Sequence, residues 1–129
     1  MVQYLSAEFL SEVEQRGRRL PERPHSNVTV QYVVSGAPDR GEVRYFFRIL
    51  KGRIEEARLG DAADPAFTVT TSYENSVRLQ QGRLHPSAAF MTGRMRATGN
   101  RAKLMAMMPM VQSREYQAML VELRDISEY

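Results

Sequence analysis

Few side chains in this sequence are of the types that enzymes use, and their spacing keeps them apart. His25 and His85 each lie beside a proline in a loop-like context, and neither has a second ligand at the spacing of a metal site. Glu55 and Glu56 are adjacent in a predicted strand, so their carboxylates point to opposite faces and cannot share acid–base work. Glu74 fits a helix cap better than a catalytic acid. The sequence therefore predicts surface histidines, no metal site and no catalytic residues.

Other kinds of chemistry are excluded by what the chain lacks. It has no cysteine, which excludes disulfides, thiolate zinc sites and cysteine nucleophiles. It also has no Gly-x-Ser-x-Gly elbow, no phosphate-binding loop and no dinucleotide fingerprint. We therefore expect a protein that is not an enzyme and that needs no cofactor.

The composition is that of a globular protein, with 43% hydrophobic and 26% charged residues among 129. This length predicts a single domain over residues 1–129. The net charge of +3 permits an anionic partner without requiring one. The apolar runs are much shorter than the roughly 20 residues that span a bilayer, and no basic region precedes an apolar one at the amino terminus. We expect a cytoplasmic protein.

Capping residues and stop signals predict five helices. Ser6 can cap a first helix that Gly17 ends, and Leu5, Phe9, Leu10 and Val13 form its apolar stripe. A capping box at 71–74 opens a second helix that ends at Gly82. The remaining helices are predicted over 86–91, from Asn100 to a stop at Pro109, and over 113–125.

Alternating apolar and polar residues predict five strands, over 27–34, 42–50, 53–59, 66–70 and 94–98. The turns between the first four strands are short. They favour an antiparallel meander, because parallel strands need a crossover of a dozen or more residues. The expected fold class is α+β, a five-stranded and mostly antiparallel sheet with helices packed on one face.

Seven of the eight methionines lie in the last third of the chain. Such soft side chains either fill gaps in a core or line a cavity for a flexible apolar ligand. Composition alone leaves both interpretations open.

The segment from Gly82 to Asn100 closely resembles the signature of the sterol carrier protein 2 family. That signature has a Gly-basic-apolar-x-Pro element, then Ala-Phe-x-x-Gly followed by basic and apolar residues, and then Gly-Asn or Gly-Asp opening a helix. Ala89, Phe90 and Gly93 match the middle element, and Gly99 and Asn100 match the last. The segment Pro65–Thr70 is similar to the strand that precedes this part of the family pattern.

The resemblance implies an α/β fold in which helices cover a five-stranded sheet over an apolar tunnel. It also implies binding and transfer of sterols, fatty acids, fatty acyl-CoA or similar lipids. The sequence departs from the family in ending with Ser127-Glu128-Tyr129, without the Ser-Lys-Leu type of tail found in peroxisomal members, so we expect no peroxisomal import. It also has an extra amphipathic helix at 113–125.

We expect a lipid to lie between the sheet and the carboxyl-terminal helices. The residues predicted to line this cavity are large and apolar: Phe67, Phe90, Met91, Leu104, Met105, Met108, Met119, Leu120 and Leu123. Four basic residues are predicted to meet an anionic head group or to form a solvated face: Arg94, Arg96, Arg101 and Lys103.

The leading hypothesis is a lipid-binding protein that exchanges its ligand with a membrane surface. The alternative is a non-catalytic interaction module without lipid cargo, in which the last helix forms a homodimer or docks on a larger enzyme. Binding of nucleic acid is not expected, because no aromatic residues interleave with the basic ones.

Overall fold

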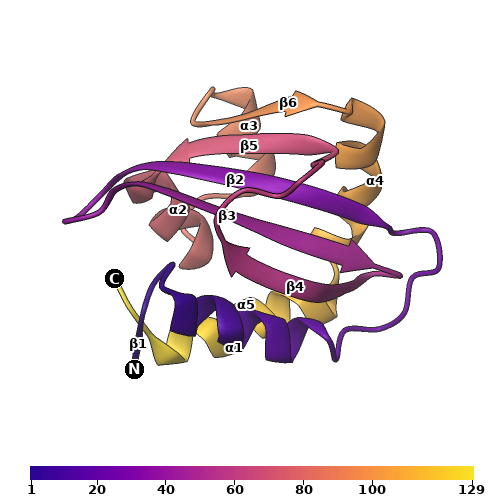
Figure 1. The fold of residues 1–129 in the computed structure, drawn as a ribbon, viewed down its shortest axis with the longest axis horizontal. Coiled ribbons are helices and arrows are strands. Elements are labelled where there is room, and N and C mark those ends of the chain that lie inside the picture. The colour runs from indigo at the N-terminus through magenta and orange to yellow at the C-terminus, as the bar shows by residue number, and fades with distance from the viewer.

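The computed structural model describes residues 1–129 and contains the five predicted strands of the main sheet. They are β2 (Val28–Ala37), β3 (Gly41–Leu50), β4 (Arg53–Leu59), β5 (Phe67–Ser72) and β6 (Met95–Gly99). Their order across the sheet is β4-β3-β2-β5-β6 (Figure 1). Three of the four neighbouring pairs are antiparallel, and β2 and β5 are parallel. The α+β class with a mostly antiparallel sheet is confirmed.

The prediction of a meander through the fourth strand is wrong, because β5 pairs with β2 and not with β4. Residues 60–66 cross β3 and β2 in front of the sheet in Figure 1. Leu59 of β4 pairs with Tyr45 of β3, Tyr45 pairs with Tyr32 of β2, and Tyr32 pairs with Val69 of β5. Leu59 and Val69 therefore lie in one row across the sheet, and this is why the loop can be so short. The chain therefore retraces only about two residues along the strands while it crosses three strand spacings, roughly 14 Å.

The predicted helices are present at nearly the predicted positions. They are α1 (Ala7–Gly17), α2 (Tyr73–Gln80), α3 (Pro86–Met91), α4 (Arg101–Val111) and α5 (Arg114–Ile126). Three predicted caps are confirmed by side-chain oxygens that accept backbone N–H groups: Ser6 from Phe9 at 3.1 Å, Asn100 from Lys103 at 3.1 Å and Ser113 from Tyr116 at 3.2 Å.

Two helix boundaries differ from the prediction. Ser72, and not Thr71, caps α2, because Thr71 is still in β5 and donates its hydroxyl to the carbonyl of Arg94 at 2.8 Å. Helix α4 continues past Pro109 to Val111. Proline lacks the backbone N–H that a helix uses as a donor. Because Pro109 lies in the last turn of α4, the helix continues for two more residues before it ends. His85 also caps α3, accepting from the N–H of Ser87 at 3.1 Å, a role that the sequence did not reveal.

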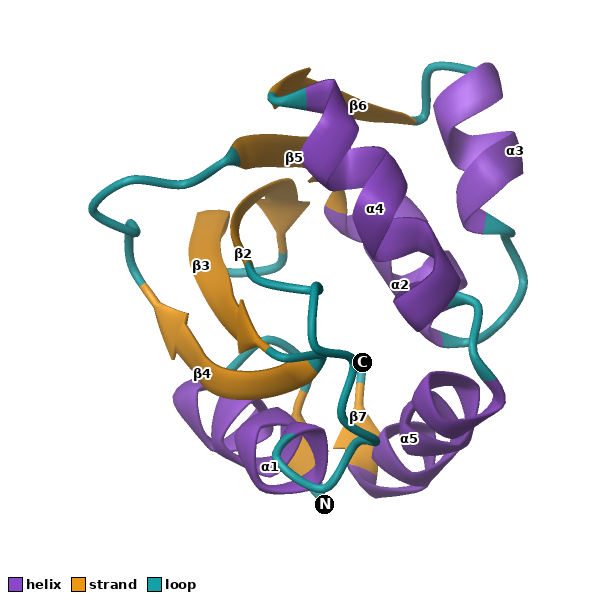
Figure 2. Cartoon of the chain, turned by 90° about the vertical axis from the view of Figure 1, so that its right-hand side faces the viewer, coloured by secondary structure: helices purple, strands orange, loops and turns teal.

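The helices cover one face of the sheet and leave the other open (Figure 2). The covered face carries the apolar residues of the predicted alternation, among them Val30, Val34, Tyr45, Phe47 and Val69. These residues belong to one hydrophobic core that extends into the helices. None of the helices is long and apolar enough to cross a membrane.

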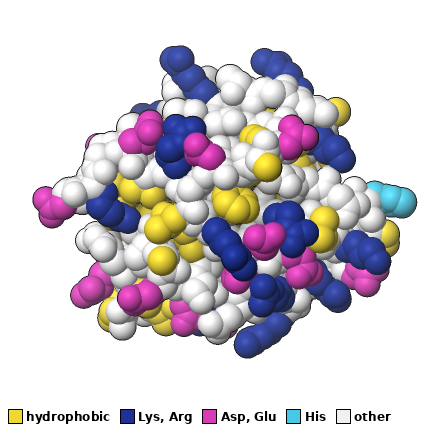
Figure 3. Space-filling model, viewed as in Figure 1, with side chains coloured by type: hydrophobic (Ala, Val, Ile, Leu, Met, Phe, Trp, Pro, Cys, Tyr) yellow, Lys and Arg dark blue, Asp and Glu magenta, His cyan; other side chains and the backbone are white.

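Positive and negative side chains alternate across the open face, with apolar side chains visible between them (Figure 3). Gln31 is the buried polar residue of this face. Its amide donates to the carbonyls of Tyr45 and Gly60, each at 3.1 Å, and accepts from the N–H of Ala62 at 2.7 Å. Gln31 thereby binds the loop between β4 and β5 to the sheet.

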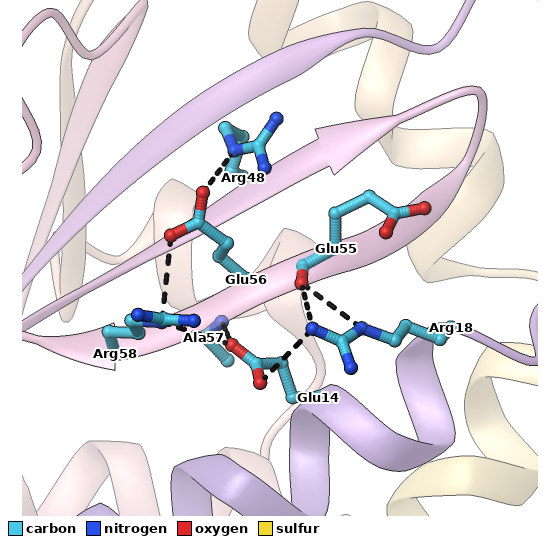
Figure 4. A network of polar contacts seen from close by, with 7 residues as sticks. All are labelled: Glu14, Arg18, Arg48, Glu55, Glu56, Ala57 and Arg58. Carbon is cyan, nitrogen blue, oxygen red and sulfur yellow. Dashed lines mark hydrogen bonds and ion pairs between the residues drawn. The ribbon is translucent and has the colours of Figure 1, made fainter.

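Helix α1 protects the free edge of β4 through the polar network in Figure 4. Glu14 accepts from the N–H of Ala57 at 3.0 Å and from Arg58 at 3.3 Å, and Arg18 donates to the carbonyl of Glu55 at 3.1 Å. These contacts occupy backbone groups that would otherwise be open to pairing with another strand.

The two ends of the chain lie together (Figure 1). Strand β1 (Val2–Gln3) pairs in parallel with β7 (Ser127–Glu128), and the N–H of Tyr4 donates to the carbonyl of Glu128 at 2.8 Å. This small second sheet holds α1 beside α5. No pattern in the sequence predicted it, because each strand has only two residues.

Candidate functional site

A cavity of about 180 Å³ lies between the covered face of the sheet and the helices. It is lined by 24 residues, of which 19 are hydrophobic. The sheet contributes Tyr32, Tyr45, Phe47 and Val69. No Asp, Glu, His, Lys or Arg lines the cavity, so its surface can bury an apolar molecule but presents no carboxylate or imidazole to a ligand.

Helix α4 forms one wall of the cavity. Leu104, Met107, Met108 and Val111 line it at the i, i+3, i+4, i+7 spacing of a single helix face. Met105 lies about 100° from Leu104 around the same helix and is 66% exposed. Met105 and Met108 were both predicted to line the cavity, but only Met108 belongs to the inward stripe.

The opposite wall comes from the two ends of the chain. Tyr116, Met119, Leu120 and Leu123 line the cavity from α5, again at the spacing of one helix face. Leu5, Phe9 and Val13 line it from the amino-terminal segment and α1. The sequence analysis predicted the contribution of α5 but not that of α1, which was treated only as part of the scaffold.

Six of the nine residues predicted to contact a lipid are brought together around the cavity: Phe90, Leu104, Met108, Met119, Leu120 and Leu123. Three are not. Met91 ends the short helix α3 and is 87% exposed, and Met105 is on the outer face of α4. Phe67 is buried at the start of β5 beneath Gly99, where the backbones approach so closely that a Cβ on Gly99 would lie 2.8 Å from the Phe67 Cα.

The four basic residues predicted to meet a head group are all exposed, and none lines the cavity. Arg94 and Arg96 flank the inward-facing Met95 and therefore point away from the covered face. Arg101 and Lys103 lie in the first turn of α4, where the ammonium group of Lys103 donates to the carbonyl of Asn27 at 3.1 Å. These residues can meet a charged group only outside the cavity.

Tyrosines supply half of the polar side chains in the cavity lining. Tyr4, Tyr32, Tyr45 and Tyr116 all line it, and burial raises the pKa of each hydroxyl, for Tyr116 to about 12. The Tyr4 hydroxyl is paired with the Ser76 hydroxyl at 2.7 Å. The apolar alternation of the two strands did not predict that Tyr32 and Tyr45 would line a cavity.

Gln80 adds a buried amide to the same region, on the inner side of α2. Its Nε2 atom makes no hydrogen bond. Burial raises the pKa of the nearby Tyr129 hydroxyl, and Gln80 offsets a part of that rise. The backbone carbonyl of Gln80 accepts from Arg124 of α5 at 3.0 Å, which joins α2 to α5 beside the cavity.

This arrangement, in which helices border an apolar cavity against one face of a sheet, is of the kind that suits an apolar ligand. Comparison with known proteins agrees with this interpretation. A sequence model of the SCP-2 sterol transfer family matches residues 14–112. The chain therefore belongs to the SCP-2 sterol transfer family, which supports lipid binding or transfer as its general activity.

Solved structures share the fold at low sequence identity. A crystal structure of sterol carrier protein 2 has a TM-score of 0.71 and 16% identity, over 95% of this chain and 98% of that one. A conserved hypothetical protein from Thermus thermophilus has a TM-score of 0.65 and 16% identity, over 97% and 87%. Palmitated SCP2L2 from Aedes aegypti has a TM-score of 0.62 and 21% identity, over 80% and 89%. No curated protein sequence matches the chain.

Proposed function

We propose that this protein binds one lipid molecule in the cavity between the sheet and the helices and carries it between membrane surfaces. The observation that carries the proposal is the cavity itself, with its 19 hydrophobic lining residues and no ionised side chain. The palmitated state of the related Aedes aegypti protein supports an acyl chain as one ligand type. The proposal is therefore one of binding and transfer.

The energetics favour exchange over permanent retention. Each methylene moved from water into an apolar site gains about 0.8 kcal/mol, and a bilayer offers the same chain a similar gain. The net free energy of transfer between membrane and protein is therefore small, which allows loading and release. Because the cavity of about 180 Å³ is below the roughly 300–1,000 Å³ of most ligand pockets, a long lipid has to push the helices outward or extend through the open side of the cavity. The flexible side chains of Met107, Met108 and Met119 suit that expansion.

The outward methionines support a membrane-facing surface on α3 and α4. Met91 and Met105 are large apolar side chains with little contact to the protein. Arg94, Arg101 and Lys103 are close to them in sequence and are also exposed. Apolar side chains that enter the interface, together with cations that attract anionic lipids, are a standard means of transient membrane attachment. We therefore propose that Arg94, Arg101 and Lys103 attract anionic membrane lipids at this surface, and that they do not bind the ligand in the cavity.

Native mass spectrometry of the protein purified from cells tests the proposal. We expect a mass shift equal to one lipid, and loss of that shift after delipidation. A protein that carries no lipid, binds none of the fatty acids, acyl-CoA esters or sterols offered at micromolar concentration, and is a dimer would contradict the proposal. That result would favour the non-catalytic interaction module.

A vesicle assay tests the membrane surface separately. Met91→Glu and Met105→Glu should slow lipid transfer from anionic vesicles by about tenfold or more while leaving affinity for lipid in solution unchanged. Leu59→Glu is the matched control, because Leu59 is also exposed but lies on the edge strand β4, away from α3 and α4. Equal transfer rates for all three variants would refute this assignment.

A further inference from the structure

Three tyrosine hydroxyls inside the cavity have no hydrogen-bond partner in the protein. Tyr32 and Tyr45 are directly opposite each other on β2 and β3, and their rings stack with centroids 4.7 Å apart and planes 11° apart. Tyr116 lines the same cavity from α5. Tyr45 and Tyr116 are only 7% and 8% exposed.

These hydroxyls face open space and not packed protein. Each oxygen keeps accessible surface although its residue is buried or half-buried, and all three residues line the cavity. Tyr4 provides the contrast, since its hydroxyl in the same cavity is satisfied by Ser76 at 2.7 Å. A ligand that fills the cavity displaces the water that can reach these hydroxyls, and a buried hydroxyl left without a partner is costly. Three such hydroxyls around one cavity therefore favour a ligand that supplies the missing partner.

The charge of that partner follows from the rest of the lining. No lysine, arginine or histidine lines the cavity, so no cation in it compensates a negative charge. Burial already disfavours the ionised form of the three tyrosines themselves. A carboxylate placed among them would meet the same penalty, whereas a neutral oxygen would accept from the hydroxyls without it.

We propose that the hydroxyls of Tyr32, Tyr45 and Tyr116 form a polar subsite within the cavity that hydrogen-bonds an uncharged oxygen of the lipid, that of an alcohol or of an ester carbonyl. The inference rests on the proposed function, because it names the head group of the lipid in that same cavity. The subsite selects neutral lipids over ionised fatty acids, and it places the polar end of the ligand inside the protein.

Calorimetric titration with three ten-carbon probes tests the subsite. Decan-1-ol, methyl decanoate and decanoate share one chain length and differ in the head group, and decanoate is ionised at pH 7.5. We expect wild-type protein to bind both neutral probes about tenfold or more tightly than decanoate. Tyr32→Phe, Tyr45→Phe and Tyr116→Phe each remove one hydroxyl and keep the ring. Each should weaken decan-1-ol by about threefold to tenfold and change decanoate by less than twofold.

Two controls separate this role from a structural one. Tyr129→Phe removes a hydroxyl outside the cavity lining and should change none of the affinities. The three cavity variants should melt no lower than wild type, because the hydroxyls they lose have no partner in the free protein. A merely structural role would instead lower the melting temperature and weaken all probes alike.

The possible failures are distinguishable. If the three probes bind but decanoate is as tight as decan-1-ol, or if the variants weaken no probe or weaken every probe equally, the subsite is refuted and the cavity proposal stands. If no probe binds to wild-type protein and longer lipids also fail to bind, the proposed function is refuted and the subsite with it.

Discussion

A negative charge on the inner face of α4 should weaken lipid binding strongly, whereas the same charge on the outer face should leave binding almost unchanged. Met108 is on the cavity face of the helix, and Met105, three residues earlier, is on the outer face and 66% exposed. In Met108→Glu the new carboxylate lies against an apolar lining without a compensating cation. If that environment raises its pKa by about 2 units when lipid is bound, the ionised form loses about 2.7 kcal/mol of binding free energy, roughly 100-fold in affinity. In Met105→Glu the carboxylate stays in water, and we expect less than a twofold change.

The assay is a titration with a fluorescent lipid that has an uncharged head group, so that pH acts only on the protein. Binding by Met108→Glu should recover as the pH falls from about 8 to about 5, because the protonated carboxyl is neutral. Thermal unfolding of both variants shows whether each is folded at the assay temperature. The reasoning is refuted if folded Met108→Glu binds as tightly as wild type, or if Met105→Glu loses as much affinity as Met108→Glu.

Three further perturbations test other parts of the structure. Gly93 has φ of +74° and open space around it. In a urea titration, Gly93→Val should therefore lower the free energy of unfolding by more than about 1 kcal/mol, and Gly93→Asn should lower it by less. Equal stability of wild type and the valine variant would contradict the left-handed turn at Gly93. Burial raises the pKa of Tyr32, Tyr45 and Tyr116 above the unfolded value of 10, so stability should be level below pH 10 and fall above it, by at most about 1.4 kcal/mol per pH unit for each tyrosine. Tyr45→Phe should make that fall shallower, and an unchanged slope would contradict the burial. Glu14→Ala removes the acceptor for the β4 backbone and for Arg58 and should cost about 1–2 kcal/mol of stability by denaturant unfolding; a loss below about 0.3 kcal/mol would show that water replaces the contact.

Local signals in the sequence predicted the elements of the fold well. The alternation in 27–34 and 42–50 became β2 and β3 with the expected inward faces, because a period of two residues leaves little choice once one face is buried. Asn100 and Ser113 cap α4 and α5 as expected, since a cap depends only on neighbouring backbone groups. The resemblance around Gly93 and Gly99 agrees with the positive φ angles of both glycines.

Tertiary relations were harder to predict. The partner of β5 depends on the register of three other strands, which no local pattern encodes, so the loop length pointed to the wrong neighbour. The inward face of α4 was misjudged for Met105 because methionines cover several sides of that helix, and only the packing of Leu104, Met107 and Met108 identifies the face toward the cavity. The tyrosine hydroxyls could not be distinguished from ordinary core residues, because a lack of partners becomes visible only when the surrounding side chains are placed.

The construction of the cavity from both ends of the chain has a consequence for synthesis. The sheet, α2 and α3 precede α5, yet Tyr116, Met119 and Leu123 of α5 complete the wall opposite the sheet. At roughly 5–20 residues per second, the apolar face of the sheet is translated several seconds before its last cover. During that interval the nascent chain exposes the apolar face of the sheet, and the cavity is incomplete. A ribosome-bound chain that stops before α5 should therefore recruit chaperones and retain no lipid, and cargo loading should begin only after α5 has emerged and docked.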